Sequence, residues 1–398
     1  MISIFMNSGS IPLLILSYIP PGLTLPTSAR DFPASFCAIP PRSAHILLSG
    51  IRAQKDSYSL LYITALGKAR DFPQNIPPPV RVPDPVLTER QVFMSKQKPT
   101  LFRGAATALI TPMTQGRIDF EAFGQLIDRQ IRQKIDALII AGTTGESATL
   151  SDPEKVALFA YAAERIHGQV PLIAGVGCAD TAHTILTARA ACSAGADALL
   201  VVTPYYNRPS QAGLRAHYET VADAAEKPIY LYSVPGRTGV TVSTQTYEIL
   251  AEHPNIWGVK EANTDMGAVN ALIDRCSQRL DIYAGNDHLT IPFLALGATG
   301  VISVLSNLVP DAVHDICRLW NEGKPRLAAA KAARYHTLLD TLFAESNPQP
   351  VKSALAMLGL CREEFRLPMT PPSPDIRERL RHCLAELHLL PEQEEDIP

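Results

Sequence analysis

The sequence predicts a (β/α)8 TIM barrel, an α/β fold, followed by a C-terminal helical extension. From Gly104 onward, short apolar runs recur at regular intervals and helical patterns separate them. Eight such β–α units over about 200 residues are typical of a closed parallel barrel, whereas a doubly wound sheet rarely gives eight evenly spaced crossovers. After the eighth run the chain is helical throughout, and it is longer than a minimal barrel needs.

The expected strands are short apolar segments, as is typical of strands buried on both faces of a parallel sheet. They comprise residues 105–111, 137–141, 171–176, 198–203, 228–232, 256–260, 281–284 and 300–304. The helical patterns between the first strands comprise residues 119–133, 152–167, 181–194 and 211–225.

Helix start and stop signals support these boundaries. Ser151-Asp152-Pro153-Glu154 combines an N-cap candidate with an early proline and acidic residues, and Thr181 and Ser210 are further N-cap candidates. Gly195 stands where a helix is expected to end. The eighth barrel helix and the helices of the extension are expected at 311–321, 326–343, 350–358 and 374–389. We therefore expect a catalytic barrel at 94–322 and a helical extension at 323–398.

Residues 1–93 differ from the barrel in composition, because prolines are frequent and no helical or strand period persists. Such a segment cannot easily bury enough surface to offset its ordering entropy, so we expect it to be disordered or absent from the mature protein. Three origins compete. One is a secretory signal, but the segment lacks the positive n-region of such a signal. Another is a transit peptide, which would direct the protein to a plastid. The origin that we favour is an upstream stretch preceding a true start at Met94.

Composition and charge argue against several classes of function. The net charge of -3 indicates neither a nucleic-acid partner nor an anionic membrane. No apolar run approaches the roughly 18 residues of a membrane span. The seven cysteines include no CxxC pair, which argues against a zinc site or a disulfide framework and favours a reducing, cytoplasmic compartment.

Polar side chains follow several expected strands at the point where each strand ends. Because a barrel carries its chemistry at the carboxyl ends of its strands, these groups share one face. An amine nucleophile, phenols that move protons and an arginine that holds a carboxylate suit carbonyl chemistry, and no metal-type cluster occurs among them. The segments are Gly142-Thr143-Thr144-Gly145-Glu146-Ser147, Thr203-Pro204-Tyr205-Tyr206-Asn207-Arg208-Pro209, Tyr232-Ser233-Val234-Pro235-Gly236-Arg237-Thr238-Gly239, Lys260 and Gly285-Asn286-Asp287.

Lys260 is the candidate nucleophile. It ends an apolar run, where a lone lysine is costly unless it is neutral or paired. A lysine whose pKa is lowered by burial forms Schiff bases with carbonyl substrates. An arbitrary lysine at a strand end more often reaches into water, but the neighbouring strand-end groups favour a catalytic role here.

Taken together, these motifs resemble those of the dihydrodipicolinate synthases, a family of the class I, lysine Schiff-base, pyruvate-dependent aldolases and lyases. The resemblance runs from about Phe102 to Leu390 and leaves the N-terminal segment outside. Further segments that agree with the family pattern are Val259-Lys260-Glu261-Ala262, Gly300-Val301-Ile302-Ser303-Val304, Asn347-Pro348-x-Pro350-Val351-Lys352 and Leu367-Pro368-Met369-Thr370-Pro371.

The resemblance implies that pyruvate condenses with L-aspartate-4-semialdehyde to give 4-hydroxy-tetrahydrodipicolinate, on the diaminopimelate route to lysine. Lys260 would form the Schiff base with pyruvate, so neither an external cofactor nor a metal is expected. Thr144 and the backbone around Ile302 would hold the pyruvate carboxylate, and Arg237 would bind the carboxylate of the second substrate.

The resemblance also implies a proton relay and an assembly. Tyr232 would be the general acid and base, and Thr143 would link it to Tyr206, which would reach in from a neighbouring subunit. Family members are usually dimers of tight dimers, so we expect a homotetramer.

Two departures from the family pattern bear on substrate choice and regulation. Ser233 stands where the family commonly has asparagine, and some related hydroxy-oxoglutarate aldolases carry serine there. The positions that match the family's lysine-inhibition site are Ala179, His183, Asp152 and Lys155. A methyl group, an imidazole and a cation cannot replace groups that pair with the charges of free lysine, so we expect weak or absent inhibition by lysine.

Two alternative functions remain open at this point. Related pyruvate aldolases (4-hydroxy-2-oxoglutarate aldolase, keto-deoxy-gluconate aldolase and N-acetylneuraminate lyase) would retain Lys260 and Tyr232 and bind another second substrate. Arg237 argues against them, because a small acidic aldehyde needs it more than a sugar does. A non-catalytic barrel would have lost at least one of the lysine, tyrosine and threonine groups, and all are present.

Overall fold

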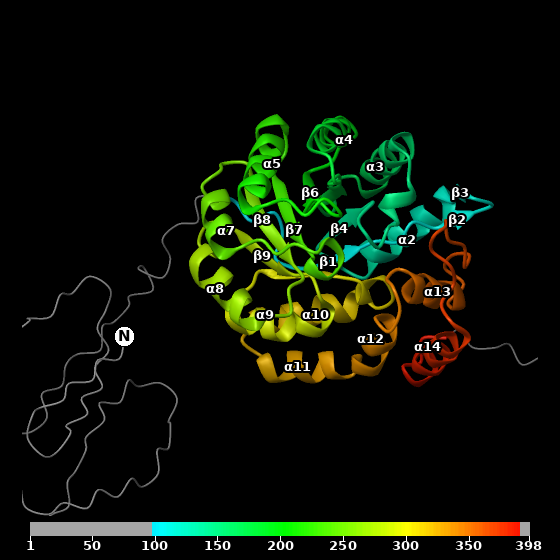
Figure 1. Ribbon diagram of the computed structural model, residues 1–398. Helices are drawn as coiled ribbons and strands as arrows, with labels where there is room; N and C mark the ends of the chain where they lie inside the picture. The colour runs from blue at the N-terminus through cyan, green and yellow to red at the C-terminus, as the bar shows by residue number, and fades with distance from the viewer. Residues whose placement is uncertain (1–97, 391–398) are drawn as a thin grey trace, which may run out of the picture. The chain divides into compact units, whose positions relative to one another are not determined.

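The computed structural model describes residues 98–390, so our expectation for residues 1–93 falls outside the described part of the chain. Parallel strands close into a barrel in the order β1-β10-β9-β8-β7-β6-β5-β4 (Figure 1). The predicted (β/α)8 barrel is therefore confirmed. The barrel strands are β1 (Gly104–Ala108), β4 (Ala137–Ile140), β5 (Leu172–Gly175), β6 (Ala198–Val202), β7 (Ile229–Ser233), β8 (Ile256–Glu261), β9 (Asp281–Ala284) and β10 (Gly300–Ser303).

Alternate side chains of each strand face the interior and the exterior of the barrel. In β7, Tyr230 and Tyr232 belong to the buried cluster inside the barrel, whereas Leu231 packs in the outer layer between sheet and helices. The register of β8 sets Lys260 beside Tyr232 of β7 and Tyr283 of β9. The alternation of side chains along β8 explains how a lysine in an apolar run comes to point into the barrel.

A ring of helices surrounds the barrel (Figure 1). Its members are α2 (Phe120–Arg132), α3 (Asp152–Ile166), α4 (Thr181–Ser193), α5 (Gln211–Ala224), α7 (Thr244–Ala251), α8 (Met266–Cys276), α9 (Thr290–Leu296) and α10 (Pro310–Asn321). Short helical turns lie in the loops at the strand ends, namely η1 (Ser147–Thr149), α6 (Pro235–Thr238), η2 (Asp287–Leu289) and η3 (Leu305–Asn307). None of the helices within residues 98–390 has the length and apolar character of a membrane span.

The helix boundaries follow the capping signals, with one correction. The N–H of Ser151 donates to the Glu154 carboxylate at 2.9 Å, and Ser210 caps α5 by accepting from the N–H of Gly213. The cap of α4 is Asp180 and not Thr181, because the Asp180 carboxylate reaches the first free N–H groups of the helix. Gly195, with φ 95°, follows the end of α4 as expected.

The amino end of the barrel is filled with aromatic side chains. The rings of Phe102 and Tyr283 stack with their centroids 4.3 Å apart, and the Tyr283 hydroxyl donates to the Phe102 carbonyl at 2.5 Å. Tyr230 contributes a third ring, with its centroid 6.0 Å from that of Tyr283. This packing leaves the carboxyl end of the barrel for chemistry.

The C-terminal extension consists of α11 (Pro325–Ala333), α12 (His336–Leu342), α13 (Gln349–Met357) and α14 (Pro374–Glu386). The single helix expected at 326–343 is wrong, because the chain turns at Arg334 and Tyr335, whose N–H groups bond to carbonyls three residues back. The turn lets α11 pack on α10 while α12 packs on α13 and α14.

A hairpin of two short strands, β2 (Met113–Thr114) and β3 (Arg117–Ile118), was not expected. Gln115 and Gly116 at its turn both have positive φ, as a tight hairpin turn of this kind requires. Both of their N–H groups donate to the carboxylate of Glu364, so the extension holds the hairpin (Figure 1).

Candidate active site

Lys260 lies near the carboxyl end of β8 and is only 5% exposed. Its Nζ atom lies 4.5 Å from the centroid of the Tyr232 ring. Burial lowers the pKa of Lys260 to about 8, with Asp287 opposing the shift and Arg237 adding to it. Lys260 therefore carries far more neutral amine near physiological pH than an ordinary lysine does, and the neutral amine is the form that attacks a carbonyl.

Asp287 is a buried carboxyl group that acts on Lys260, and no role was expected for it. It accepts a hydrogen bond of 2.5 Å from the Ser303 hydroxyl and one of 2.8 Å from the N–H of Val304. Burial raises the pKa of Asp287, and these two donors and Lys260 oppose the rise. Its position after β9 places it on the catalytic face, but its partners at the carboxyl end of β10 cannot be identified from sequence alone.

Tyr232 is the phenol adjacent to the amine and is 7% exposed. Burial raises its pKa, whereas Arg237 and a hydrogen bond with the Thr143 side chain lower it. The structure thus places Tyr232 next to both Lys260 and Thr143. A phenol held next to a neutral amine can transfer protons to and from a carbonyl oxygen during addition and dehydration.

Thr144 and Arg237 are joined through Asn347 of the extension. The Asn347 side-chain amide donates to the Thr144 hydroxyl oxygen at 2.9 Å, and the Arg237 guanidinium donates to the Asn347 carbonyl at 2.9 Å. Because the Thr144 oxygen already accepts a bond, its hydroxyl hydrogen can donate to a ligand carboxylate. The motif containing Asn347 was visible in the sequence, but its contact with a loop 203 residues away was not.

Ile302 lies on β10, is 1% exposed, and belongs to the buried cluster inside the barrel. Its side chain therefore fills the barrel interior, and only its backbone can serve a polar ligand. Ser303, the next residue, donates to Asp287, which ties this strand end to the surroundings of Lys260.

Tyr206 stands apart from the other expected site residues. It lies in the loop after β6 with φ 71° and is 94% exposed, so it does not join the buried cluster around Lys260 within one chain. Its expected role in a relay with Tyr232 requires a second chain and stays a prediction.

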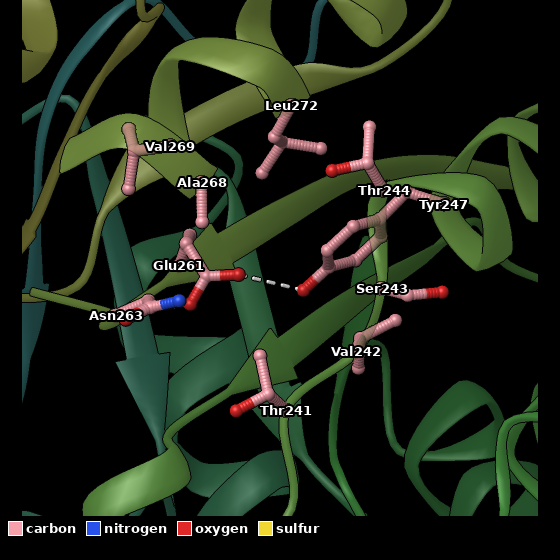
Figure 2. Close-up of a pocket in the computed structure, with 10 residues that line it drawn as sticks. All are labelled: Thr241, Val242, Ser243, Thr244, Tyr247, Glu261, Asn263, Ala268, Val269 and Leu272. Carbon is pink, nitrogen blue, oxygen red and sulfur yellow. Dashed lines mark hydrogen bonds between the residues drawn. The ribbon is translucent and has the colours of Figure 1, made fainter. Parts of the chain in front are cut away.

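A separate cavity of about 180 Å³ lies on the outer side of β8, next to α7 and α8 (Figure 2). Glu261 lines it and accepts hydrogen bonds from the Tyr247 hydroxyl at 2.7 Å and the N–H of Asn263 at 2.8 Å. Ser233 is paired in register with Glu261, so it follows the same outward period. The side chain of Ser233, where the chain departs from the family pattern, therefore points away from the catalytic face.

The positions matched to the family's lysine-inhibition site lie close together. His183 Nε2 lies 3.1 Å from the Asp152 carboxylate, and Lys155 Nζ lies 3.8 Å from it. The carboxylate of this group is therefore already in contact with the His183 imidazole and the Lys155 ammonium of its own chain. Among residues 98–390, no group of three or more His, Cys, Asp or Glu side chains is arranged to hold a metal ion.

Comparisons with known proteins agree with this geometry. The profile of the dihydrodipicolinate synthetase family matches residues 101–387. A 4-hydroxy-tetrahydrodipicolinate synthase of Gluconobacter oxydans is 44% identical over 295 residues, which are 73% of this chain and 98% of the relative.

Solved structures give the same result. The crystal structure of dihydrodipicolinate synthase from Aquifex aeolicus superposes with a TM-score of 0.72 at 40% identity, covering 73% of this chain and all of that one (100%). The chloride-inhibited enzyme from Acinetobacter baumannii, complexed with pyruvate, gives a TM-score of 0.72 at 39% identity, covering 73% and 100%. The chain belongs to the dihydrodipicolinate synthetase family.

Proposed function

We propose that this chain is a 4-hydroxy-tetrahydrodipicolinate synthase, a lyase that joins pyruvate to L-aspartate-4-semialdehyde on the diaminopimelate route to lysine. The observation that carries the proposal is Lys260, a buried lysine with a pKa lowered to about 8 beside Tyr232 at the carboxyl end of a barrel. Relatives that share this name at 40–44% identity support the choice of substrates.

The reaction begins on Lys260. Its neutral amine adds to the ketone carbon of pyruvate, and Tyr232 protonates the oxygen, which leaves as water to give the Schiff base. The hydroxyl of Thr144 and the backbone near Ile302 hold the pyruvate carboxylate during these steps. The Tyr232 phenolate then takes a methyl proton, which restores the phenol and converts the Schiff base to an enamine, whose electron pair supplies the carbon nucleophile.

The second substrate enters with its carboxylate on Arg237, which presents two parallel donors to a carboxylate. The enamine carbon attacks the aldehyde, and the resulting alkoxide takes a proton from Tyr232. The amino group of the bound semialdehyde then attacks the Schiff-base carbon and displaces Lys260, which closes the ring and frees the enzyme. The lysine itself provides the electron sink, so the reaction uses no external cofactor.

The proton route and the assembly extend the proposal. We infer that Thr143 links Tyr232 to a Tyr206 from a second subunit, because Tyr206 is 94% exposed in the single chain. A homotetramer made of tight dimers supplies that second subunit. We place the enzyme in the cytoplasm, because its cysteines are all free within the described residues.

The experiment that tests the substrate choice is a coupled assay on the purified chain with pyruvate and a panel of aldehydes. L-aspartate-4-semialdehyde is expected to give the highest kcat/KM, followed at a distance by glyoxylate, glyceraldehyde and N-acetylmannosamine. A higher kcat/KM with glyoxylate or a sugar would assign the chain to one of the related aldolases. No observation favours that outcome, since the side chain of Ser233 points to the outer side of β7 and not toward the substrates.

A further inference from the structure

A fully buried ion pair joins the threonine loop to the C-terminal extension. Lys352 Nζ on α13 lies 2.7 Å from Glu146 Oε1, and the two side chains are 0% and 1% exposed. The other carboxylate oxygen of Glu146 accepts a 3.3 Å hydrogen bond from the N–H of Arg366. Each oxygen of this one carboxylate is therefore held by a different part of the extension.

Burying such a pair is costly, and an apolar pair of similar volume often stabilises a fold as well or better. Burial lowers the pKa of Lys352, and its pairing with Glu146 opposes the shift. The ring of Phe365 lies 5.0 Å from the ammonium and covers it on one side. General stability is thus a weak explanation for this pair, and a geometric role explains it better.

The backbone of Glu146 points to the same conclusion. Glu146 has φ 57° and ψ 34°, a left-handed conformation that is strained for a residue with a long side chain and that glycine adopts freely. The chain nevertheless has glutamate at this position, two residues after Thr144. A side chain held by the extension fixes this turn and with it the direction in which Thr143 and Thr144 point.

The ion pair and the Asn347 contact act on the same loop from one segment. Asn347 donates to Thr144, and Lys352, five residues further along the chain, bonds to Glu146. The N–H of Lys352 also donates to the carbonyl of Pro348 at 3.0 Å, which keeps both contacts in one rigid turn. The loop and the extension therefore form one unit.

We propose that the Glu146–Lys352 pair is a positioning device for the reaction, through which the C-terminal extension aligns the Thr143-Thr144 loop for pyruvate. The proposal rests on the function proposed above. Neither residue touches the reacting atoms. Their effect is transmitted through Thr144, which binds the pyruvate carboxylate, and through Thr143, which is bonded to Tyr232.

The test is the double variant Glu146→Gln/Lys352→Met, which keeps the side-chain volumes and leaves no unpaired buried charge. Its readout is borohydride trapping of pyruvate, followed as the pyruvate concentration that gives half-maximal trapping. We expect that concentration to rise about 10- to 100-fold, as a misplaced binding group does, while the thermal midpoint stays near that of the wild type. The KM for the aldehyde is expected to stay near the wild-type value.

A matched control removes another ion pair of the extension, Arg377 with Glu363, which lie 2.9 Å apart and whose side chains are 43% and 20% exposed. Arg377→Met/Glu363→Gln is expected to leave the pyruvate dependence of trapping unchanged. Wild-type pyruvate dependence in Glu146→Gln/Lys352→Met, with or without a lower thermal midpoint, would overturn the proposal.

A second variant covers the case in which the double variant does not fold. Glu146→Asp keeps the charge and the pair but shortens the reach by one methylene, so it should fold and displace the loop. Positioning predicts a raised half-saturating pyruvate concentration for it, and a purely structural charge pair predicts the wild-type value. If wild-type chain traps no pyruvate, the proposed function fails; if the wild type traps it and these variants match it, only the positioning inference fails.

Discussion

Replacing Asp287 with asparagine is expected to lower the pH at which Lys260 becomes a nucleophile. Burial lowers the pKa of Lys260, and the charge of Asp287 raises it. Removing that charge takes away the stabilisation of the ammonium and leaves the burial cost in place. The pKa of Lys260 should therefore fall below about 8, and trapping of pyruvate should reach its plateau at a lower pH than in the wild type.

The size of the wild-type effect follows from the shift itself. A fall from 10.5 to about 8 corresponds to roughly 3 kcal/mol between the two protonation states. At pH 7 the neutral fraction is then about 9%, against about 0.03% for an ordinary lysine. This makes about 300 times more nucleophile available, so a change in the surroundings of Lys260 is readily measured.

The assay is the initial rate of borohydride trapping with pyruvate across neutral and alkaline pH. The wild-type rate is expected to rise with a midpoint near pH 8. Asp340→Asn is the matched control, because Asp340 pairs with His288, the residue after Asp287, and is 51% exposed. Its midpoint should match that of the wild type. A midpoint in Asp287→Asn that stays in place or moves to higher pH would refute the reasoning.

Four further predictions concern the relay, the extension and regulation. Asn347→Ala removes the donor to Thr144 and should raise the KM for pyruvate about 3- to 10-fold; an unchanged KM would contradict this. Tyr206→Phe should lower kcat about 10²-fold or more without changing the thermal midpoint, and full activity would remove Tyr206 from the relay. Arg366 holds the pKa of Glu154 at about 2, below 4.5, so stability present above pH 4.5 is lost as the pH falls towards 2. Urea unfolding should show a smaller loss over that window in Glu154→Gln; an equal loss would contradict the assignment. Free lysine should inhibit weakly or not at all, and half-inhibition at sub-millimolar lysine would contradict that expectation.

The barrel was predictable because its strands are buried on both faces. The apolar run that contains Lys260 predicts a strand. Successive side chains of a strand point to opposite faces, so Lys260 and its partner Tyr232 both point into the barrel. Local signals also located most helix ends, including Gly195 after α4. At the start of α4 the expected cap, Thr181, was wrong by one residue, because the Asp180 carboxylate accepts from the free N–H groups of the helix.

The contributions of the extension could not be predicted, because they depend on contacts between distant parts of the chain. Asn347 and Thr144 are 203 residues apart, and Lys352 and Glu146 are 206 apart. No local pattern links such residues. Asp287 is a similar case, since its effect on Lys260 depends on how β9 and β10 bring Ser303 and Val304 to its carboxylate.

The central claim is that Lys260 captures pyruvate covalently, and the most direct measurement is mass mapping of the adduct after borohydride reduction with pyruvate. We predict a single reduced pyruvyl adduct on the peptide that contains Lys260, and none in Lys260→Arg, which keeps the charge without a nucleophilic amine. An adduct on another lysine, no adduct at all, or full turnover in Lys260→Arg would contradict the account.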